Sequence, residues 1–244
     1  MTLQIHTQGD GPDLVLLHGW GMNAAVWRAL ATELARDFRV HAVELGDFGG
    51  MPQRLAAALP ARVTACGWSL GGQLALAWAQ QFPAQVGRLV LLATTPRFVC
   101  ADDWPHGMTD TEFEEFAAEV AGDPRRARLR FLALQATGDV AAHAVLRDLR
   151  EAIAQGGEAD RNALTAGLQL LRETDLRGVL AKIEQPALVM HGVNDAVIPP
   201  AAGEFLAQAL PRAEFVAVAG AAHAVFVTRE AMIAQRIREF HGRH

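Results

Sequence analysis

The sequence has few cysteines, no excess of positive charge and no long apolar run. It contains two cysteines, Cys66 and Cys100, among 244 residues, which excludes a disulfide framework. The formal net charge is −5 and the pI is near 6.0, so the chain lacks the basic footprint that general nucleic-acid or anionic-membrane binding needs. No apolar run could cross a bilayer, and residues 1–11 lack the pattern of a secretory signal. We therefore expect a cytoplasmic protein that binds neither nucleic acid nor membrane.

Signals for bound groups are also missing. The sequence has no residues at metal-ligand spacing, and Gly46-Asp-Phe-Gly-Gly50 is typical of a turn and not of a phosphate-binding loop. We expect no metal and no cofactor. The apolar fraction is 51%, and the chain is long enough for one α/β domain with a large core and an insertion.

Apolar runs alternate with amphipathic segments along most of the chain. The expected strands are residues 14–17, 40–45, 63–66, 89–93, 187–191 and 215–218. Helices are expected after an Asn23 cap, over residues 69–81, and after a Thr228 cap with Met232, Ile233, Ile237 and Phe240 facing inward. This alternation predicts an α/β fold with a mostly parallel, twisted sheet flanked by helices on both faces.

The alternation stops between residues 97 and 180, where helical patterns follow one another without a convincing strand. Thr109 and Glu112 form a capping-box pattern, and Asp123 with Pro124 marks the next helix start. Two more helical patterns cover residues near 140–154 and 158–171. We expect residues 1–96 and 181–244 to form the core and residues 97–180 an inserted helical cap over the site, within a single structural domain.

The segment Gly67-Trp-Ser-Leu-Gly71 places Ser69 between two glycines directly after an apolar run. A serine in a sharp strand-to-helix turn needs neighbours without a Cβ so that the backbone can close, and the turn then exposes its Oγ at the top of a sheet. The pattern therefore indicates a nucleophile elbow. Because so short a pattern also occurs by chance, the alternative is an ordinary glycine-flanked helix start.

A serine hydroxyl is a weak nucleophile near neutral pH, so it needs a base and an anion that orients the base. Asp195 follows the expected strand 187–191, and the carboxyl ends of strands are where open α/β sheets bind ligands. His223 follows the next strand in a Gly-Ala-Ala-His loop. The chain order Ser69, Asp195, His223 is that of the α/β hydrolases.

Two other assignments stay open at this point. Asp195 and the asparagine before it are also typical of a simple turn. His191 is a weaker candidate for the base, and the other histidines are expected to be structural or surface groups.

The intermediate of acyl transfer also needs hydrogen-bond donors for its oxyanion. In this fold they are the amide after the nucleophile, here that of Leu70, and an amide from an early loop. The loop at residues 17–21, Leu-His-Gly-Trp-Gly, follows a strand, so we expect the Trp20 amide to be the second donor and His18 to brace the loop. The Trp20 indole either lines the acyl pocket or simply packs.

Four segments carry a resemblance to a known family. Residues 16–27 (Leu-Leu-His-Gly-Trp-Gly-Met-Asn-Ala-Ala-Val-Trp), 67–72 (Gly-Trp-Ser-Leu-Gly-Gly), 130–135 (Arg-Phe-Leu-Ala-Leu-Gln) and 221–223 (Ala-Ala-His) span both the core and the insertion. With them, the chain resembles the α/β-hydrolase superfamily and, more narrowly, the biotin-pathway carboxylesterases that act on pimeloyl-[acyl-carrier protein] methyl ester. The first and third segments are more specific than the elbow.

The resemblance implies a set of substrate-site residues and a partner. The implied substrate-binding residues are Trp20, Ser69, Leu70, Phe131, Leu132, Ala133, Leu134, Gln135 and His223. The implied partner is an acidic acyl carrier protein, for which a basic window with Arg126, Arg130 and Arg147 offers a docking face. Without the resemblance, residues 131–135 are equally typical of cap core and the arginines of a solvated helix face.

The chain departs from the family pattern in two places. After Glu44 and Leu45 the family usually continues with a Pro-Gly-Phe-Gly-Arg-Ser-like turn and a longer helix, whereas this chain has a shorter connection through Pro52. His143 stands where a further cap arginine is usual. The pocket mouth and the carrier surface are therefore expected to differ in detail.

The residues predict a serine hydrolase with Ser69, Asp195 and His223 as its triad. The resemblance implies that it is a carboxylesterase that hydrolyses the methyl ester of pimeloyl-[acyl-carrier protein], and we expect a monomer. The alternatives are a broad short-chain esterase, a hydrolase of carbon–carbon bonds with the same triad, and a non-catalytic binding module on the same fold.

Overall fold

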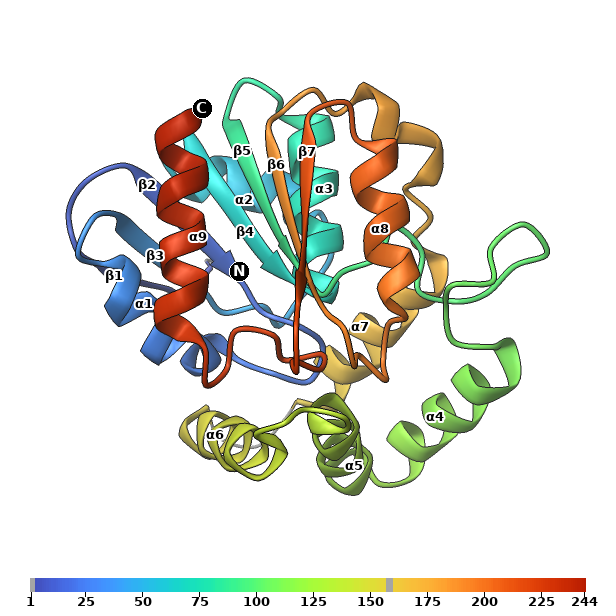
Figure 1. Ribbon diagram of the computed structural model, residues 1–244. Helices are drawn as coiled ribbons and strands as arrows, with labels where there is room; N and C mark the ends of the chain where they lie inside the picture. The colour runs from blue at the N-terminus through green and yellow to red at the C-terminus, as the bar shows by residue number, and fades with distance from the viewer. Residues whose placement is uncertain (1–2, 157–159) are drawn as a thin grey trace.

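The computed structural model describes residues 3–156 and 160–244. Its sheet has the order β1-β3-β2-β4-β5-β6-β7, and only the β1–β3 pair is antiparallel (Figure 1). The strands are β1 (Ile5–Gln8), β2 (Asp13–Leu17), β3 (Arg39–Val43), β4 (Val63–Trp68), β5 (Val86–Leu92), β6 (Ala187–Gly192) and β7 (Ala213–Val218). The predicted mostly parallel α/β sheet is confirmed.

Helices cover both faces of the sheet (Figure 1). One face carries η1 (Ala24–Trp27), α1 (Arg28–Leu34) and α9 (Glu230–Arg243), and the other carries α2 (Met51–Ala58), α3 (Leu70–Gln81) and α8 (Pro200–Ala209). Strands β2, β4, β5 and β6 are buried almost throughout because both of their faces are covered, which explains their near-continuous apolar sequences.

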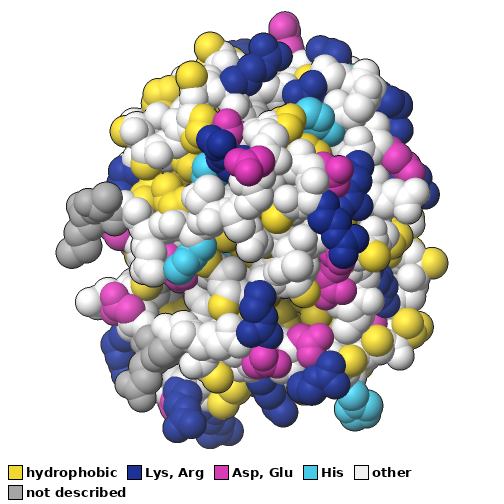
Figure 2. Space-filling model, turned by 90° about the vertical axis from the view of Figure 1, so that its left-hand side faces the viewer, with side chains coloured by type: hydrophobic (Ala, Val, Ile, Leu, Met, Phe, Trp, Pro, Cys, Tyr) yellow, Lys and Arg dark blue, Asp and Glu magenta, His cyan; other side chains and the backbone are white. Residues whose placement is uncertain are grey.

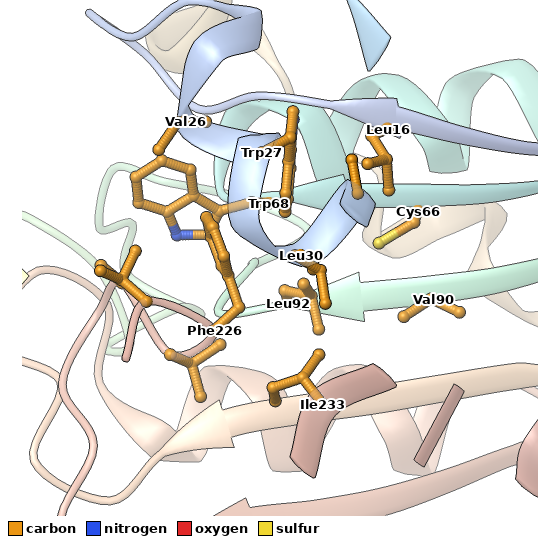
Figure 3. Close-up of a cluster of buried hydrophobic side chains, with 14 of the residues drawn as sticks. Leu16, Val26, Trp27, Leu30, Cys66, Trp68, Val90, Leu92, Phe226 and Ile233 are labelled. Atoms are coloured by element: carbon orange, nitrogen blue, oxygen red, sulfur yellow. The ribbon is translucent and has the colours of Figure 1, made fainter. Parts of the chain in front are cut away.

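The core on the η1, α1 and α9 side is built around aromatic side chains (Figure 3). Trp27 is fully buried and stacks on Phe226 at 4.3 Å between ring centroids, and Trp68 packs edge-on against Phe226. Burying side chains of this size stabilises a fold by about 1.5–3 kcal/mol each. Since Trp68 immediately precedes Ser69, this core also fixes the base of the elbow.

Within the described residues, four α-helices lie between β5 and β6 in the chain, and they gather at one end of the sheet, at the bottom of Figure 1. These inserted helices are α4 (Asp110–Gly122), α5 (Pro124–Ala136), α6 (Ala142–Gln155) and α7 (Arg161–Glu173), followed by η2 (Arg177–Lys182). The predicted Thr109–Glu112 capping box is present, and the Asp123 side chain caps α5 as predicted. In the described parts of the chain, no helix is long and apolar enough to cross a membrane.

Three local predictions need correction or qualification. Strand β1 was not among the expected strands, because it is a short, largely exposed edge strand with little apolar signal. Thr228 does not cap α9: it adopts φ 67°, its amide is bound by the Glu230 carboxylate, and the helix begins at Glu230 without a side-chain cap. Met232 is 37% exposed and does not face inward. The predicted helix start at Glu158 lies outside the described residues.

Candidate active site

Ser69 occupies a tight turn between β4 and α3. Its backbone has φ 56° and ψ −120°, a conformation rarely adopted by residues with a side chain, as a nucleophile elbow requires. The Ser69 amide donates to the Leu92 carbonyl, and the Thr94 hydroxyl donates to the Ser69 carbonyl at 2.6 Å. A Cβ on Gly71 would lie 2.1 Å from the Leu17 carbonyl oxygen, so the turn closes only with glycine there.

Asp195 and His223 meet at the carboxyl ends of β6 and β7. The His223 Nδ1 donates to Asp195 Oδ2 at 2.9 Å, and both side chains are almost completely buried. The Trp68 indole donates to the His223 carbonyl at 3.0 Å, so the residue before Ser69 ties the histidine loop to the elbow. The structure therefore brings together two residues of the expected triad that are 28 residues apart in the sequence.

The His223 Nε2 is buried and has no hydrogen-bond partner within residues 3–156 and 160–244. Since Nδ1 carries the proton toward Asp195, Nε2 is the nitrogen with a free lone pair. The Ser69 hydroxyl does not bond to it in this structure. Catalytic hydrogen bonds often form only when substrate is bound. The free lone pair on Nε2 is therefore what qualifies His223 as a candidate base.

Asp195 is held by more donors than His223 alone. Its Oδ1 accepts from the amides of Val197 and Ile198 at 2.8 and 2.9 Å. His191 Nε2 lies 3.0 Å from Asp195 Oδ2, and also 3.0 Å from the Ile198 carbonyl. Burial opposes ionisation, but the charge of His223 and the hydrogen bonds of both histidines hold the pKa of Asp195 well below its usual range.

His191, the weaker candidate for the base, is a buried neighbour of Asp195, a contact that the sequence did not predict. Its Nε2 lies near the same Asp195 oxygen, Oδ2, that accepts from His223, and the residue is 1% exposed. Its spacing of four residues from Asp195 was the available signal, but four-residue spacing places two side chains on one side only in a helix, and here β6 ends between them.

The expected oxyanion loop lies against the elbow. A Cβ on Gly19 would lie 3.3 Å from the Ser69 Cβ, which puts the two backbones in direct proximity. Among the described residues, neither the Leu70 amide nor the Trp20 amide has an acceptor, so both remain available. His18 braces the loop as predicted: its Nδ1 donates to the Gly19 carbonyl, and its Nε2 accepts from the Leu45 amide.

Apolar side chains of the inserted helices form one buried cluster with Trp20 and Leu70, beside the elbow. The Trp20 ring packs edge-on against Phe116 and Phe131 at about 5 Å, and its indole N–H donates to the Leu164 carbonyl of α7 at 2.9 Å. Leu70 belongs to the same buried cluster. The Trp20 side chain therefore joins the oxyanion loop to the inserted helices.

The other implied substrate residues lie on two sides of α5. Phe131 faces Trp20, whereas Leu132 packs into the core cluster on the α1 and α9 side. Ala133 is exposed and Leu134 half-buried. Gln135 is buried, and its Oε1 has no partner in the part of the chain that the structure describes.

The three arginines expected to meet a carrier are exposed, and Arg130 pairs with Glu119 and Arg147 with Asp148. Arg128, part of the same basic window, is buried and donates to the Gly21 carbonyl of the oxyanion loop. Figure 2 shows basic and acidic side chains interspersed on the face it draws, with several basic ones along the lower edge, where the inserted helices lie.

The fold and the site together define an α/β hydrolase. The α/β hydrolase fold family matches residues 53–230. A solved structure of an esterase from Exiguobacterium antarcticum shares the fold with a TM-score of 0.87 at 22% identity, covering 98% of this chain and 94% of that chain.

Curated relatives are more specific. The pimeloyl-[acyl-carrier protein] methyl ester esterase of Nitrosomonas europaea is 40% identical over 238 residues, which cover 93% of this chain and 94% of the relative. The protein of the same name from Aeromonas salmonicida is 36% identical and covers 99% of this chain and 100% of the relative. The chain therefore belongs to the α/β-hydrolase family and, within it, to the family of these esterases. The resemblance seen in the sequence and the expected class, a carboxylic ester hydrolase, are confirmed.

Proposed function

We propose that this chain is a serine carboxylesterase that hydrolyses the methyl ester of pimeloyl-[acyl-carrier protein] in biotin biosynthesis, releasing methanol and pimeloyl-carrier protein. The observation that carries this proposal is that relatives at 36–40% identity over most of the chain bear this activity in their names. The buried Asp195–His223 hydrogen bond supports its catalytic part. The proposed setting is a monomer in the cytoplasm.

In the proposed mechanism, Ser69 Oγ attacks the ester carbonyl carbon while its proton passes to His223 Nε2. The Trp20 and Leu70 amides stabilise the negative charge that forms on the carbonyl oxygen. His223 then protonates the leaving methoxide, and methanol departs from an acyl-Ser69 ester. A water molecule, deprotonated by His223, hydrolyses that ester and regenerates Ser69, so the reaction needs only side chains and water.

Residues 97–180 act in this proposal as a cap over the elbow. The methylene chain is proposed to lie against Trp20, Phe131 and Leu134, which belong to one apolar cluster, with Gln135 nearby on α5. Leu132 packs into the core and Ala133 is exposed, so these two members of the implied set do not line this cluster. The large apolar cluster at this place supports the idea, because a hydrocarbon chain gains free energy by leaving water. The Gln135 side-chain amide is proposed to offer the polar contact of this site, since its Oε1 has no partner within residues 3–156 and 160–244.

The nucleophile is tested by Ser69→Ala. Ser69 is the only serine in the sequence, and the chain has no tyrosine, so a fluorophosphonate probe has one expected target. We expect one covalent adduct by intact mass on the wild type and none on the variant, with a loss in kcat for p-nitrophenyl butyrate of roughly 10⁴-fold or more. A folded variant that keeps full hydrolysis would refute the assignment.

The carrier is tested by reversing two charges, Arg126→Glu with Arg130→Glu. On carrier-bound methyl pimelate, kcat/KM should fall about tenfold or more at low salt and less at high salt, because long-range attraction is screened. Hydrolysis of p-nitrophenyl butyrate should not change. Arg236→Glu with Arg243→Glu, both exposed on α9, is the control matched for net charge. Equal kcat/KM on carrier-bound and free short esters would favour the broad esterase instead.

A further inference from the structure

A buried ion pair joins the turn between α5 and α6 to the loop that carries His223. The Asp139 carboxylate is 1% exposed and accepts four hydrogen bonds. Its Oδ1 accepts from the Ala141 amide at 2.8 Å and from Arg229 Nη2 at 2.9 Å. Its Oδ2 accepts from the Ala222 amide at 3.0 Å and from Arg229 Nη1 at 2.9 Å. Ala222 is the residue directly before His223.

The same turn also contacts the backbone of both catalytic loops. The Gly220 carbonyl accepts from the Val140 amide at 3.0 Å and from Arg229 Nη2 at 2.9 Å. The Asn194 side chain, directly before Asp195, donates to the Gly138 carbonyl at 2.8 Å. Residues adjacent to the acid and to the base are thus tied to one turn of the inserted helices.

Asp139 is ionised in this arrangement. Burial opposes its charge, but the Arg229 hydrogen bonds, the Ala141 and Ala222 amides and the Arg229 charge lower the pKa of its carboxyl below its ordinary value of 3.8. A buried ion pair is weak evidence for stability, because removing two charges from water offsets their attraction. The two parallel hydrogen bonds instead fix the distance and relative orientation of the Asp139 and Arg229 side chains, and so the position of the loop that carries His223.

We propose that Asp139 and Arg229 are positioning residues that hold the His223 loop against the inserted helices and so set where the His223 imidazole faces Ser69. The inference rests on the proposed triad. Asp139 acts through the Ala222 amide, one peptide from the base, while Arg229 holds Asp139 and Gly220 together. Since the Asp139 amide donates to the carbonyl of Ala136, the last residue of α5, at 3.1 Å, the pair also ties the end of α5 to the His223 loop.

Two single variants test the pair, Asp139→Asn and Arg229→Met. A displacement of the base by about 1 Å can cost about 10²-fold in rate, so we expect kcat for p-nitrophenyl butyrate to fall roughly 10- to 100-fold while KM changes less than about twofold. A residue that only stabilises the fold would lower the unfolding temperature without this split between kcat and KM.

The pH profile gives a second readout that a structural role would not move. The ionisable groups that face the His223 loop are Asp195 and His191 from the end of β6, Asp139 from the α5–α6 turn, and Arg229. Asp139→Asn leaves the Arg229 cation uncompensated, which disfavours an imidazolium, so the acid limb of kcat/KM should move to lower pH. Arg229→Met leaves the carboxylate uncompensated, so the limb should move to higher pH. The double variant should return it toward the wild-type position.

Conservative and matched variants complete the experiment. Arg229→Lys keeps the charge and loses the bidentate bond, so it should lower kcat without moving the acid limb. Glu151→Gln breaks another pair between the core and an inserted helix, Arg28–Glu151 at 2.6 Å, and should leave kcat unchanged. Folded Asp139→Asn and Arg229→Lys proteins with wild-type kcat would overturn the inference. An inactive wild type, or an active Ser69→Ala, would overturn the proposed function instead.

Discussion

The substitution Asp195→Asn distinguishes the contribution of this carboxylate to kcat from its contribution to the free energy of unfolding. The asparagine Oδ1 can still accept from the Val197 and Ile198 amides. Its NH₂ group, however, replaces the Oδ2 that accepts from His223 Nδ1 at 2.9 Å. Two donors would then face each other, so His223 must move its proton to Nε2. That tautomer cannot take the Ser69 proton.

The expected loss follows from this change of tautomer. We expect kcat to fall about 10⁴-fold, as with a wrong-tautomer histidine in a serine triad, which is about 5.4 kcal/mol of barrier. The stability loss is smaller, about 2 kcal/mol, because the amide replaces part of two charge-assisted hydrogen bonds. For a chain of this length that corresponds to a fall in Tm of about 4–8 °C.

The assay compares p-nitrophenyl butyrate hydrolysis with thermal unfolding followed by circular dichroism. Asp175→Asn is the matched control. Hydrogen bonds from Arg177 and Arg97 and the charge of Arg177 also hold the pKa of Asp175 well below its usual range. Asp175 lies between α7 and η2. This control variant should lose stability and keep kcat within about twofold. The reasoning is refuted if Asp195→Asn retains more than a tenth of the wild-type kcat, or if Asp175→Asn loses as much.

Two further predictions concern the elbow and acid stability. Gly71→Ala pushes a Cβ against the Leu17 carbonyl oxygen, so it should lower the free energy of unfolding by about 1–3 kcal/mol and reduce kcat. Gly178→Ala is the control: nothing lies within 4 Å of the added Cβ, so both quantities should stay unchanged. Because the folded-state pKa values of Asp195 and Asp139 lie below the ordinary value of 3.8, their stabilisation is complete above that pH and is lost as pH falls through the lowered pKa. Urea unfolding midpoints should therefore drop as pH falls below about 4, less steeply in Asp139→Asn, and a midpoint independent of pH between 5 and 2 would contradict this.

Strong local patterns made most of the architecture predictable. Strands covered on both faces give continuous apolar runs, and the Thr109 and Asp123 caps follow from short-range hydrogen bonds that the sequence specifies directly. Strand β1 was missed because it has no such pattern. The predicted Thr228 cap of α9 was wrong although a capping residue type is present there. At Thr228 the backbone turns into the left-handed region and the hydroxyl is no longer placed to cap.

The site divides in the same way. Residue type and chain order alone singled out the glycine-flanked Ser69, Asp195, His223 and the Trp20 loop. The structure gives Ser69 its strained turn and places Asp195 against His223, while the catalytic roles stay predictions. Which groups surround those residues could not be predicted from the sequence. The contacts of Arg128 with the Gly21 carbonyl and of Asp139 with the Ala222 amide each depend on where a distant helix or loop lies. The contact of His191 with Asp195 depends on how the chain turns after β6. Such contacts join segments 80 or more residues apart in two of these cases, and only packing of the inserted helices on the sheet decides them.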